Sequence, residues 1–220
     1  MAHARENSLE AFHLAGKMGA TGLESDVWPT ADQIPVLHHD RKFGNFFFKK
    51  SLPNITSELL PAKIPTLAEL YQKVGTEFQI SLDIKDISVV TEVISVSLQH
   101  NGAIEKLWLC HPEWRTVAEW RSLDEKIKLV DSTRLSLISE GPERRAASLA
   151  KTGINAVNLH ESDWSTGLVT MFHRFGIQCF GWDAQHKQKL DRLFKLGIDG
   201  VYSDHVDRMV TSFSEIDEDL

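Results

Sequence analysis

Short apolar segments alternate with amphipathic, helix-like segments along most of this sequence, and no other feature constrains the fold as strongly. Most of the apolar segments end in polar or charged residues just before a helical pattern begins. Strands that alternate with helices in this way predict a parallel sheet covered by helices. The strands are expected at residues 22–27, 78–84, 107–110, 127–131, 156–159, 178–181 and 200–203.

Apolar residues at helical spacing, together with capping signals, predict the helices. Asn7 is a suitable N-cap for the first helix, Glu10 completes a box-like signal, and Gly19 is a suitable stop. Thr66 and Glu69 form a capping box for the next helix, which runs to about residue 74. The later helices are expected at about 88–99, 112–122, 143–151, 166–175, 190–197 and from 204 onward.

The evenly repeated strand–helix units favour a closed (β/α)8 TIM barrel, in which catalytic groups lie at the C-terminal ends of the strands. A doubly wound open sheet is the second candidate. It would require a glycine-rich phosphate loop, and the sequence has no GxGxxG or GxxxxGK[ST] motif. We therefore expect an α/β fold with a single TIM-barrel domain over residues 1–220.

The first strand of such a barrel has no counterpart in this sequence. The segment 35–40 is interpreted as a hairpin arm, which leaves seven barrel strands. The six residues from Met1 to Glu6 cannot supply both a strand and its loop ahead of the first helix. We therefore expect a barrel that is incomplete at its N-terminal end. Because an open sheet edge can pair with another chain, we also expect a homo-oligomer.

Residues 41–64 show no clear period and contain Pro53 and Pro61, so a loop excursion is expected there. The run Phe46-Phe47-Phe48 within it predicts a buried patch beneath the loop. A lid and a membrane-touching tip are the alternatives.

The composition is that of an ordinary globular protein, with 42% hydrophobic and 25% charged residues. The net charge of −7 argues against a nucleic-acid partner. Cys110 and Cys179 do not make a disulfide framework, so a reducing compartment is expected. The sequence begins without a secretory leader and has no apolar run long enough to span a bilayer. We therefore expect a cytoplasmic protein without a transmembrane segment.

Glu24 and Asp26 lie two positions apart on the first predicted strand, so both side chains point to the same side of the sheet. Two acids there are costly unless they are paired or bound to a cation. Asp83 and Lys85 share a face of a later strand, and His39 ends the hairpin arm. Oxygen ligands suit a hard cation, Mg²⁺ or Ca²⁺, and a histidine suits acid–base catalysis. The pattern predicts a metal-assisted active site.

These residues also have ordinary structural interpretations. Glu24 and Asp26 suit ion pairs at a strand end, and Lys85 suits either a bound phosphate or a pair with Asp83. His38 is expected to be structural, because it points away from the following histidine.

Three aromatic residues end predicted strands and are further candidates. His111 and His160 are in position to face a pocket, but a lone histidine is more often a hydrogen-bonded packing residue. Trp182 is suited to stacking on a substrate, with packing as the alternative.

The candidate residues lie within longer motifs that resemble the glycerophosphodiester phosphodiesterase family. The resemblance covers nearly the whole chain, and its most specific part is Glu-x-Asp followed by a strand that ends in His-Asp. The matching segments are Glu6-Asn7-Ser8-Leu9-Glu10-Ala11-Phe12, residues 19–27, Pro35-Val36-Leu37-His38-His39-Asp40, Ile64-Pro65-Thr66-Leu67, Leu82-Asp83-Ile84-Lys85 and residues 197–204.

The resemblance implies a TIM-barrel hydrolase of lipid metabolism that cleaves glycerophosphodiesters to glycerol 3-phosphate and an alcohol. It implies that Glu24, Asp26 and Asp83 hold a divalent cation, with Asp83 standing where many members have Glu. It implies that His39 is one of two histidines that work as acid and base. An aromatic residue at the position of Trp182 is implied to stack on the glycerol moiety, and Lys85 is expected to meet the phosphate.

The family pattern opens with a His-Arg pair at the end of the first strand, and that pair has no counterpart at the matching position. His3 and Arg5 lie immediately before Glu6, in what would be the following loop. We expect either that the natural chain begins upstream or that activity is lower by roughly two to four orders of magnitude, the cost of one missing catalytic group. The alternative hypothesis is a non-catalytic barrel that binds phosphodiesters or a protein partner.

Overall fold

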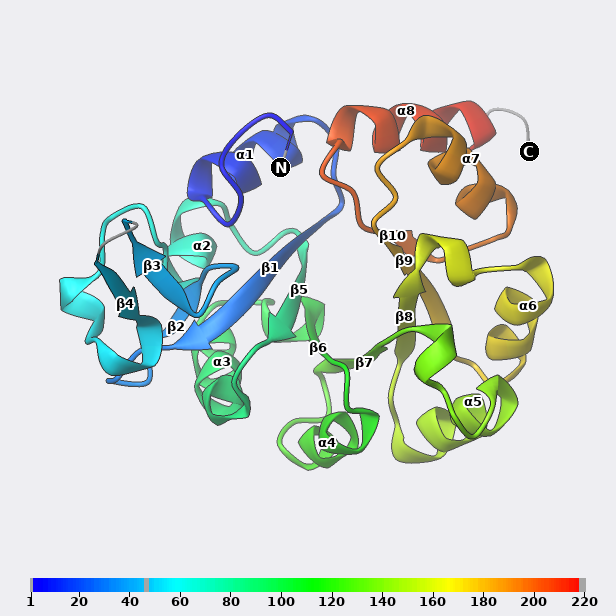
Figure 1. Ribbon diagram of the computed structural model, residues 1–220, viewed down its shortest axis with the longest axis horizontal. Coiled ribbons are helices and arrows are strands. Elements are labelled where there is room, and N and C mark those ends of the chain that lie inside the picture. Colours follow the sequence, from blue (N-terminus) through cyan, green and yellow to red (C-terminus); the bar gives the residue numbers. More distant parts are fainter. Residues whose placement is uncertain (1, 46–47, 218–220) are drawn as a thin grey trace. The chain divides into compact units, whose positions relative to one another are not determined.

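The structure, a computed structural model, describes residues 2–45 and 48–217 and divides into two compact units. The N-terminal unit comprises residues 3–17 and 21–109, and the C-terminal unit comprises residues 110–220 together with 1–2 and 18–20. In both, strands are followed by helices, as the sequence alternation predicts (Figure 1).

The sheet of the N-terminal unit is built around one parallel pair of strands. β1 (Gly22–Pro29) pairs in parallel with β5 (Gln79–Ile84), and β2 (Pro35–Leu37) returns antiparallel beside the end of β1. The predicted hairpin arm is therefore confirmed. The other main elements of this unit are α1 (Leu9–Lys17), α2 (Leu67–Lys73), α3 (Val90–Leu98) and the first residues of β6 (Leu107–His111), which lies beside β5.

The cap of α1 differs from the prediction. The Oγ of Ser8, not the side chain of Asn7, accepts the backbone N–H of Ala11, at 3.2 Å. A serine is as good a cap as an asparagine, and it stands directly at the start of the helix. No strand precedes α1 within residues 2–8, as the sequence predicts. The predicted capping box of α2, formed by Thr66 and Glu69, is confirmed.

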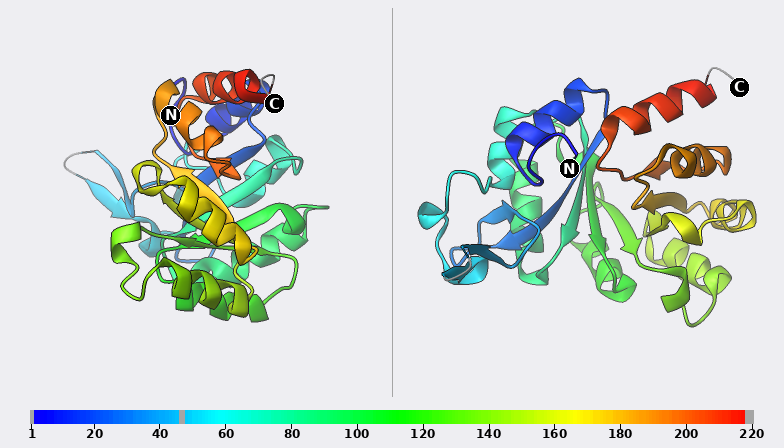
Figure 2. Two further views of the ribbon diagram at one scale, coloured as in Figure 1. Left: turned by 90° about the vertical axis from the view of Figure 1, so that its right-hand side faces the viewer. Right: turned by 45° about the horizontal axis from the view of Figure 1, so that its top comes forward.

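A small hairpin replaces the loop expected at residues 41–64. β3 (Lys42–Gly44) pairs antiparallel with β4 (Lys49–Ser51), and the hairpin extends from the rest of the N-terminal unit (Figure 2). Leu52 and Ile64 are buried together beneath it. The side chain of Phe48 is 77% exposed, so the predicted buried patch is wrong for this residue. Phe46 and Phe47 lie outside the described residues.

The C-terminal unit is a parallel sheet in the strand order β10-β9-β8-β7. Helices α5, α6 and α7 cover one side of its strands (Figure 1). The strands are β7 (Lys128–Ser132), β8 (Ala156–His160), β9 (Gln178–Trp182) and β10 (Gly200–Val201). The helices are α4 (Trp114–Glu119), α5 (Pro142–Thr152), α6 (Thr166–Arg174), α7 (Lys187–Lys195) and α8 (Val206–Asp217).

β7, β8 and β9 are buried along most of their length, and each ends in a half-buried residue. Leu129, Ala156 and Cys179 are fully buried, whereas His160 and Trp182 end their strands half-buried. Buried strands of this kind are typical of a parallel sheet that has both faces covered. The polar strand ends are therefore the places where this unit can present functional groups.

Arg121 fastens the segment after α4 to the sheet. Its guanidinium donates hydrogen bonds to the backbone carbonyls of Asp124, Glu125, Ile127 and Gly153, at 2.8–3.3 Å. It also donates to Oδ1 of Asn155, at 2.8 Å. Carbonyls left over at turns need partners, and one planar cation satisfies several of them here.

A buried ion pair joins β7 to α5. The side chain of Asp131 is fully buried and accepts a hydrogen bond from Nη1 of Arg145, at 2.7 Å, through Oδ2. Its other oxygen, Oδ1, has no hydrogen-bond partner. Burial raises the pKa of Asp131 to about 6, because the opposing attraction of Arg145 is the smaller effect.

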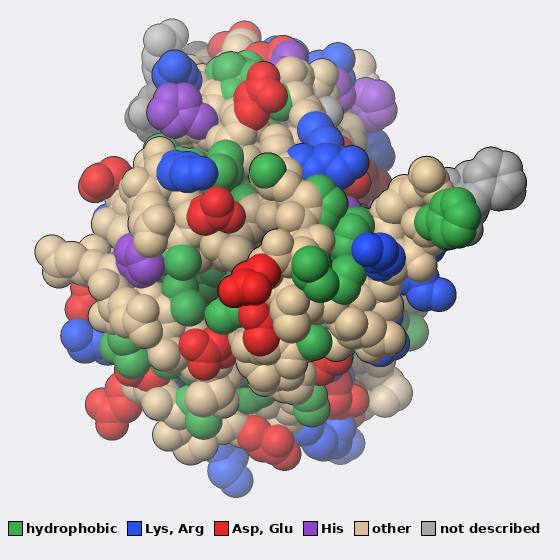
Figure 3. Space-filling view, turned by 90° about the vertical axis from the view of Figure 1, so that its left-hand side faces the viewer, with side chains coloured by type: hydrophobic (Ala, Val, Ile, Leu, Met, Phe, Trp, Pro, Cys, Tyr) green, Lys and Arg blue, Asp and Glu red, His purple; other side chains and the backbone are tan. Residues whose placement is uncertain are grey.

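Charged side chains of both signs are interspersed with hydrophobic ones on the face of the molecule that Figure 3 shows. Phe48 and Leu59 are among the large hydrophobic side chains that are exposed. Within the described ranges, no helix combines the length and the apolar character needed to cross a bilayer.

Candidate active site

Two carboxylates meet at the ends of neighbouring strands in the N-terminal unit. The register pairs Asp26 of β1 with Asp83 of β5, and Glu24 with Ser81. Because side chains alternate along a strand, Glu24, Asp26 and Asp83 share one face of this sheet. Asp26 is buried, Asp83 is half-buried and Glu24 is exposed.

Lys85 lies between the two paired acids. Its Nζ is 2.8 Å from Oδ1 of Asp26 and 2.5 Å from Oδ2 of Asp83. Burial alone would lower the pKa of Lys85, but the two carboxylates outweigh it and raise the pKa above its usual range. The ammonium group therefore stays charged, and both sequence interpretations of Lys85 remain compatible with this position.

The second oxygen of Asp26 is held by Asn7. Nδ2 of Asn7 donates to Oδ2 of Asp26 at 3.2 Å, and Oγ of Ser25 donates to Oδ1 of Asn7 at 2.5 Å. Asn7 was the predicted N-cap of α1, but in the structure Ser8 is the N-cap. The signal that could have revealed this is the Asn-Ser tandem, in which either residue is able to cap.

His39 follows directly after the residue that pairs with Asp26. The N–H of His38 donates to the carbonyl of Asp26 at 3.0 Å, which anchors the end of the hairpin arm beside β1. The side chain of His39 is 62% exposed, and its Nδ1 lies 3.1 Å from Oδ1 of Asp40. His38 instead contacts the backbone of Asp40, at 2.8 Å, which agrees with the structural role expected for it.

The acids of the N-terminal unit have the chemistry that a hard divalent cation requires. Carboxylate oxygens are the preferred ligands of Mg²⁺ and Ca²⁺. The ammonium of Lys85 already places a positive charge between Asp26 and Asp83, so these side chains are arranged to accept a cation. Each carboxylate oxygen has two lone pairs and keeps one after accepting a single hydrogen bond. Glu24, Asp26 and Asp83 are not among the described groups whose ligand atoms all lie within 4.8 Å of one another, so their role as metal ligands stays a prediction.

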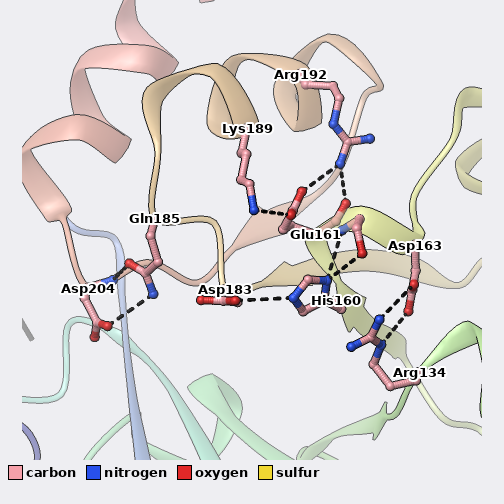
Figure 4. A network of polar contacts seen from close by, with 10 residues as sticks. Arg134, His160, Glu161, Asp163, Asp183, Gln185, Lys189, Arg192 and Asp204 are labelled. Carbon is pink, nitrogen blue, oxygen red and sulfur yellow. Dashed lines mark hydrogen bonds and ion pairs between the residues drawn. The ribbon is translucent and has the colours of Figure 1, made fainter.

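The polar strand ends of the C-terminal unit form a second cluster, in which Figure 4 shows His160 beside Asp183 and Asp163 beside Arg134. The His160 and Trp182 rings meet edge to face with centroids 4.6 Å apart, and Cζ of Arg134 lies 5.6 Å from the Trp182 ring centroid. Nε2 of His160 is 3.3 Å from Oδ2 of Asp183. Asp163 accepts two hydrogen bonds from Arg134, at 2.9 and 3.3 Å. The indole is thus held on two sides.

Next to this cluster, Glu161, which directly follows β8, forms a clamp of two ion pairs with residues of α7. The Glu161 carboxylate lies 2.5 Å from Nζ of Lys189 and 3.0 Å from Nη2 of Arg192 (Figure 4). Burial would raise the pKa of Glu161, but hydrogen bonds from the two cations lower it. No local sequence pattern reveals this clamp, because its two cations lie 28 and 31 residues further along the chain.

The remaining histidine candidate has packing contacts. Nδ1 of His111 accepts the backbone N–H of Glu113 at 3.1 Å, and the imidazole meets the Trp120 ring edge to face. These contacts agree with the packing role expected for a lone histidine.

A second set of possible metal ligands lies at the opposite ends of the strands in the C-terminal unit. Ligand atoms of His173, Cys179 and Asp199 lie within 4.8 Å of one another. However, Oδ2 of Asp199 accepts hydrogen bonds from His173 and from the backbone of Cys179, both at 2.7 Å. Burial raises the pKa of the Cys179 thiol, which disfavours the thiolate form that binds metals. This cluster is accounted for by its internal hydrogen bonds.

The profile of the glycerophosphoryl diester phosphodiesterase family matches residues 1–208. This chain belongs to that family. A glycerophosphodiester phosphodiesterase of Caldanaerobacter subterraneus is 25% identical over 235 residues, which cover 93% of this chain and 90% of that protein. Members of the family generally depend on a divalent metal ion, in agreement with the acidic donor set of the N-terminal unit.

Solved structures of the family have the same fold. A glycerophosphodiester phosphodiesterase of Thermotoga maritima is similar with a TM-score of 0.81 at 23% identity, over 96% of this chain and 93% of that one. A phosphodiesterase of Oleispira antarctica, in complex with the product sn-glycerol-3-phosphate, has a TM-score of 0.83 at 19% identity, over 97% and 93% of the two chains. The predicted TIM-barrel class is confirmed, and the glycerophosphodiester phosphodiesterases are phosphoric diester hydrolases.

Proposed function

We propose that this chain hydrolyses glycerophosphodiesters to glycerol 3-phosphate and an alcohol. Membership of the family over residues 1–208 supports this assignment, and it disfavours a non-catalytic binding barrel. The observation that carries the proposal at the level of residues is the register of Asp26 with Asp83, joined by Lys85.

In this proposal Glu24, Asp26 and Asp83 hold the divalent cation, Mg²⁺ or Ca²⁺. When bound, the cation supplies positive charge to the phosphoryl oxygens and stabilises the charge that develops on them. Lys85 adds a second positive charge at the same strand ends, which suits it to orient the phosphate.

His39 is proposed to move the proton in this reaction. Its Nδ1 is engaged by Asp40, which leaves Nε2 as the nitrogen that exchanges a proton with the substrate. His39 takes the proton of a glycerol hydroxyl, whose oxygen then bonds to the phosphorus. The bond from phosphorus to the alcohol oxygen breaks, and that oxygen takes a proton from water as the alcohol leaves. A water molecule then opens the cyclic phosphate to glycerol 3-phosphate. Trp182 is proposed to contact the glycerol moiety, and the support for this is the fixed orientation of its ring.

A hydrolysis assay on glycerophosphocholine with added Mg²⁺ or Ca²⁺ tests the proposal. We expect metal-dependent release of glycerol 3-phosphate that is lost in Glu24→Gln, because the variant keeps the shape of the side chain and removes its charge. Glu58→Gln is the matched control, since Glu58 is an exposed glutamate of the same unit and is expected to leave the rate unchanged. Activity that is equal in wild type and Glu24→Gln would remove the proposed metal site.

Further expectations from the sequence belong to the same proposal. Residues 1–220 are proposed to act as a single domain, and light scattering coupled to gel filtration checks the proposed homo-oligomer. A cytoplasmic location is proposed because Cys110 and Cys179 are both buried and neither forms a disulfide. The substrate is proposed to be a small molecule, and no nucleic-acid partner is proposed.

A further inference from the structure

Asn7 touches two side chains that point to opposite faces of β1. It donates to Oδ2 of Asp26 and accepts from Oγ of Ser25. Successive side chains on a strand alternate faces, so a single amide that reaches both must lie beside the edge of the strand. The two contacts also fix the orientation of the amide. If the amide were turned over, its oxygen would face the Asp26 carboxylate and the hydrogen bond would be lost.

The backbone of Asn7 is in a region that most residues avoid. Its φ of +50° places it in the left-handed region, which costs free energy for residues other than glycine. Glycine would adopt this conformation without strain. The cap of α1 comes from Ser8, so the helix does not require the side chain of Asn7. What the asparagine adds at this position is its amide, and the amide is directed at Asp26.

We propose that Asn7 is a positioning residue for the metal ligand Asp26. The carboxylate of Asp26 is held at Oδ2 by Asn7 and at Oδ1 by Lys85, which fixes its rotation and directs its remaining lone pairs. Ser25 acts one step further out, because its hydroxyl fixes the amide of Asn7. Outer hydrogen-bond partners of this kind orient metal ligands. The inference rests on the metal site in the proposed function.

Binding of Mn²⁺, followed by the electron paramagnetic resonance signal of the free ion, tests this role without turnover. We expect Asn7→Ala and Asn7→Gly to bind Mn²⁺ about 10- to 100-fold more weakly than wild type. Asn7→Gly is the sharper variant, because glycine keeps the backbone conformation and removes only the amide. At saturating metal, the KM for glycerophosphocholine is expected to stay at the wild-type value, since Asn7 does not touch the substrate.

A double variant separates positioning from general stability. Ser25→Ala alone should weaken Mn²⁺ binding, and Asn7→Ala combined with Ser25→Ala should bind as weakly as Asn7→Ala alone, because Ser25 acts through the amide. Gln33→Gly is the matched control, since Gln33 also has a positive φ, of +61°, and is exposed in the same unit. It is expected to bind Mn²⁺ like wild type.

Two results would count against the inference, and they have different consequences for the proposed metal site. If Glu24→Gln abolishes Mn²⁺ binding while Asn7→Gly binds like wild type, the positioning role is overturned and the metal site stands. If Glu24→Gln also binds Mn²⁺ like wild type, the proposed metal site itself fails and the role of Asn7 fails with it.

Discussion

Nζ of Lys85 lies 2.8 Å from Oδ1 of Asp26, where Asp26 is on β1 and Lys85 directly follows the neighbouring strand β5. The ammonium therefore balances an acid that is 8% exposed and would otherwise be costly to leave charged. It also stays protonated, because nearby carboxylates raise its pKa. A permanent positive charge at this point suits the binding of a phosphodiester anion.

Replacement of Lys85 by Met keeps the length of the side chain and removes the charge. We expect kcat/KM for glycerophosphocholine to fall about 10²- to 10³-fold, the usual cost of one preorganised charge at a reacting group. Lys85→Arg should retain part of the activity. Lys73→Met, an exposed lysine on α2, is the control, and equal losses in both lysine variants would contradict a specific role for Lys85.

Trp182→Ala is expected to raise the KM for glycerophosphocholine more than it lowers kcat, because the indole is proposed to bind the substrate without taking part in proton transfer. An aromatic contact contributes about 0.5–1.5 kcal/mol, which corresponds to a change of about two- to ten-fold in KM. Trp182→Phe should retain most of the affinity. A fall in kcat with an unchanged KM would point instead to a role in the chemical step.

Asp131 is expected to make stability depend on pH between about 4 and 6. Its folded-state pKa of about 6 lies above the value of 3.8 for an unperturbed group, so the folded protein binds the extra proton. The resulting stabilisation is fully present below pH 3.8 and is lost as pH rises through about 6. Its size is about 1–3 kcal/mol at most. Urea unfolding of wild type and Asp131→Asn at several pH values measures it.

The difference in the free energy of unfolding between wild type and Asp131→Asn separates the effect of Asp131 from that of the other titrating groups. The free energy of unfolding of wild type should fall relative to that of Asp131→Asn as pH rises from 4 to 7. A difference that is constant over this range would show that the pKa of Asp131 is not raised.

Arg121→Ala is expected to destabilise the protein by roughly 2–4 kcal/mol, because it leaves several carbonyls between residues 124 and 153 without their donor. The matched control is Arg115→Ala in helix α4. The side chain of Arg115 is largely exposed, and within the described residues its one salt bridge is to Glu113. The control should change the free energy of unfolding by less than about 0.5 kcal/mol. Similar losses in both variants would contradict the role given to Arg121.

The sequence was sufficient for the features that depend on local pattern. Strand–helix alternation predicted the fold class. Alternation within the strands predicted that Glu24 and Asp26 share a side of β1 and that Asp83 shares a face with Lys85. The roles of these acids, and of His39 and Trp182, stay predictions that the proposed assays address. That residues 2–8 hold no strand ahead of α1 was also expected from the sequence.

Features that depend on contacts between distant segments could not be predicted. Asn7 and Ser8 are both good caps, and only the position of β1 beside Asn7 decides which of them caps the helix. The clamp on Glu161 joins residues about one strand–helix unit apart, and a sequence pattern gives no pairing at that distance. The β3–β4 hairpin lacks an alternating apolar pattern because both of its strands are largely exposed.

Both cysteines of the chain are buried, and both belong to the C-terminal unit. Thiol-directed dyes and spin labels should therefore leave the native protein almost unmodified under non-denaturing conditions. A cysteine introduced at an exposed position of the N-terminal unit, such as Gln33, would then be the site that a maleimide labels first. Pairs of such labels, one in each unit, would allow motions of this protein to be followed while glycerophosphocholine is added.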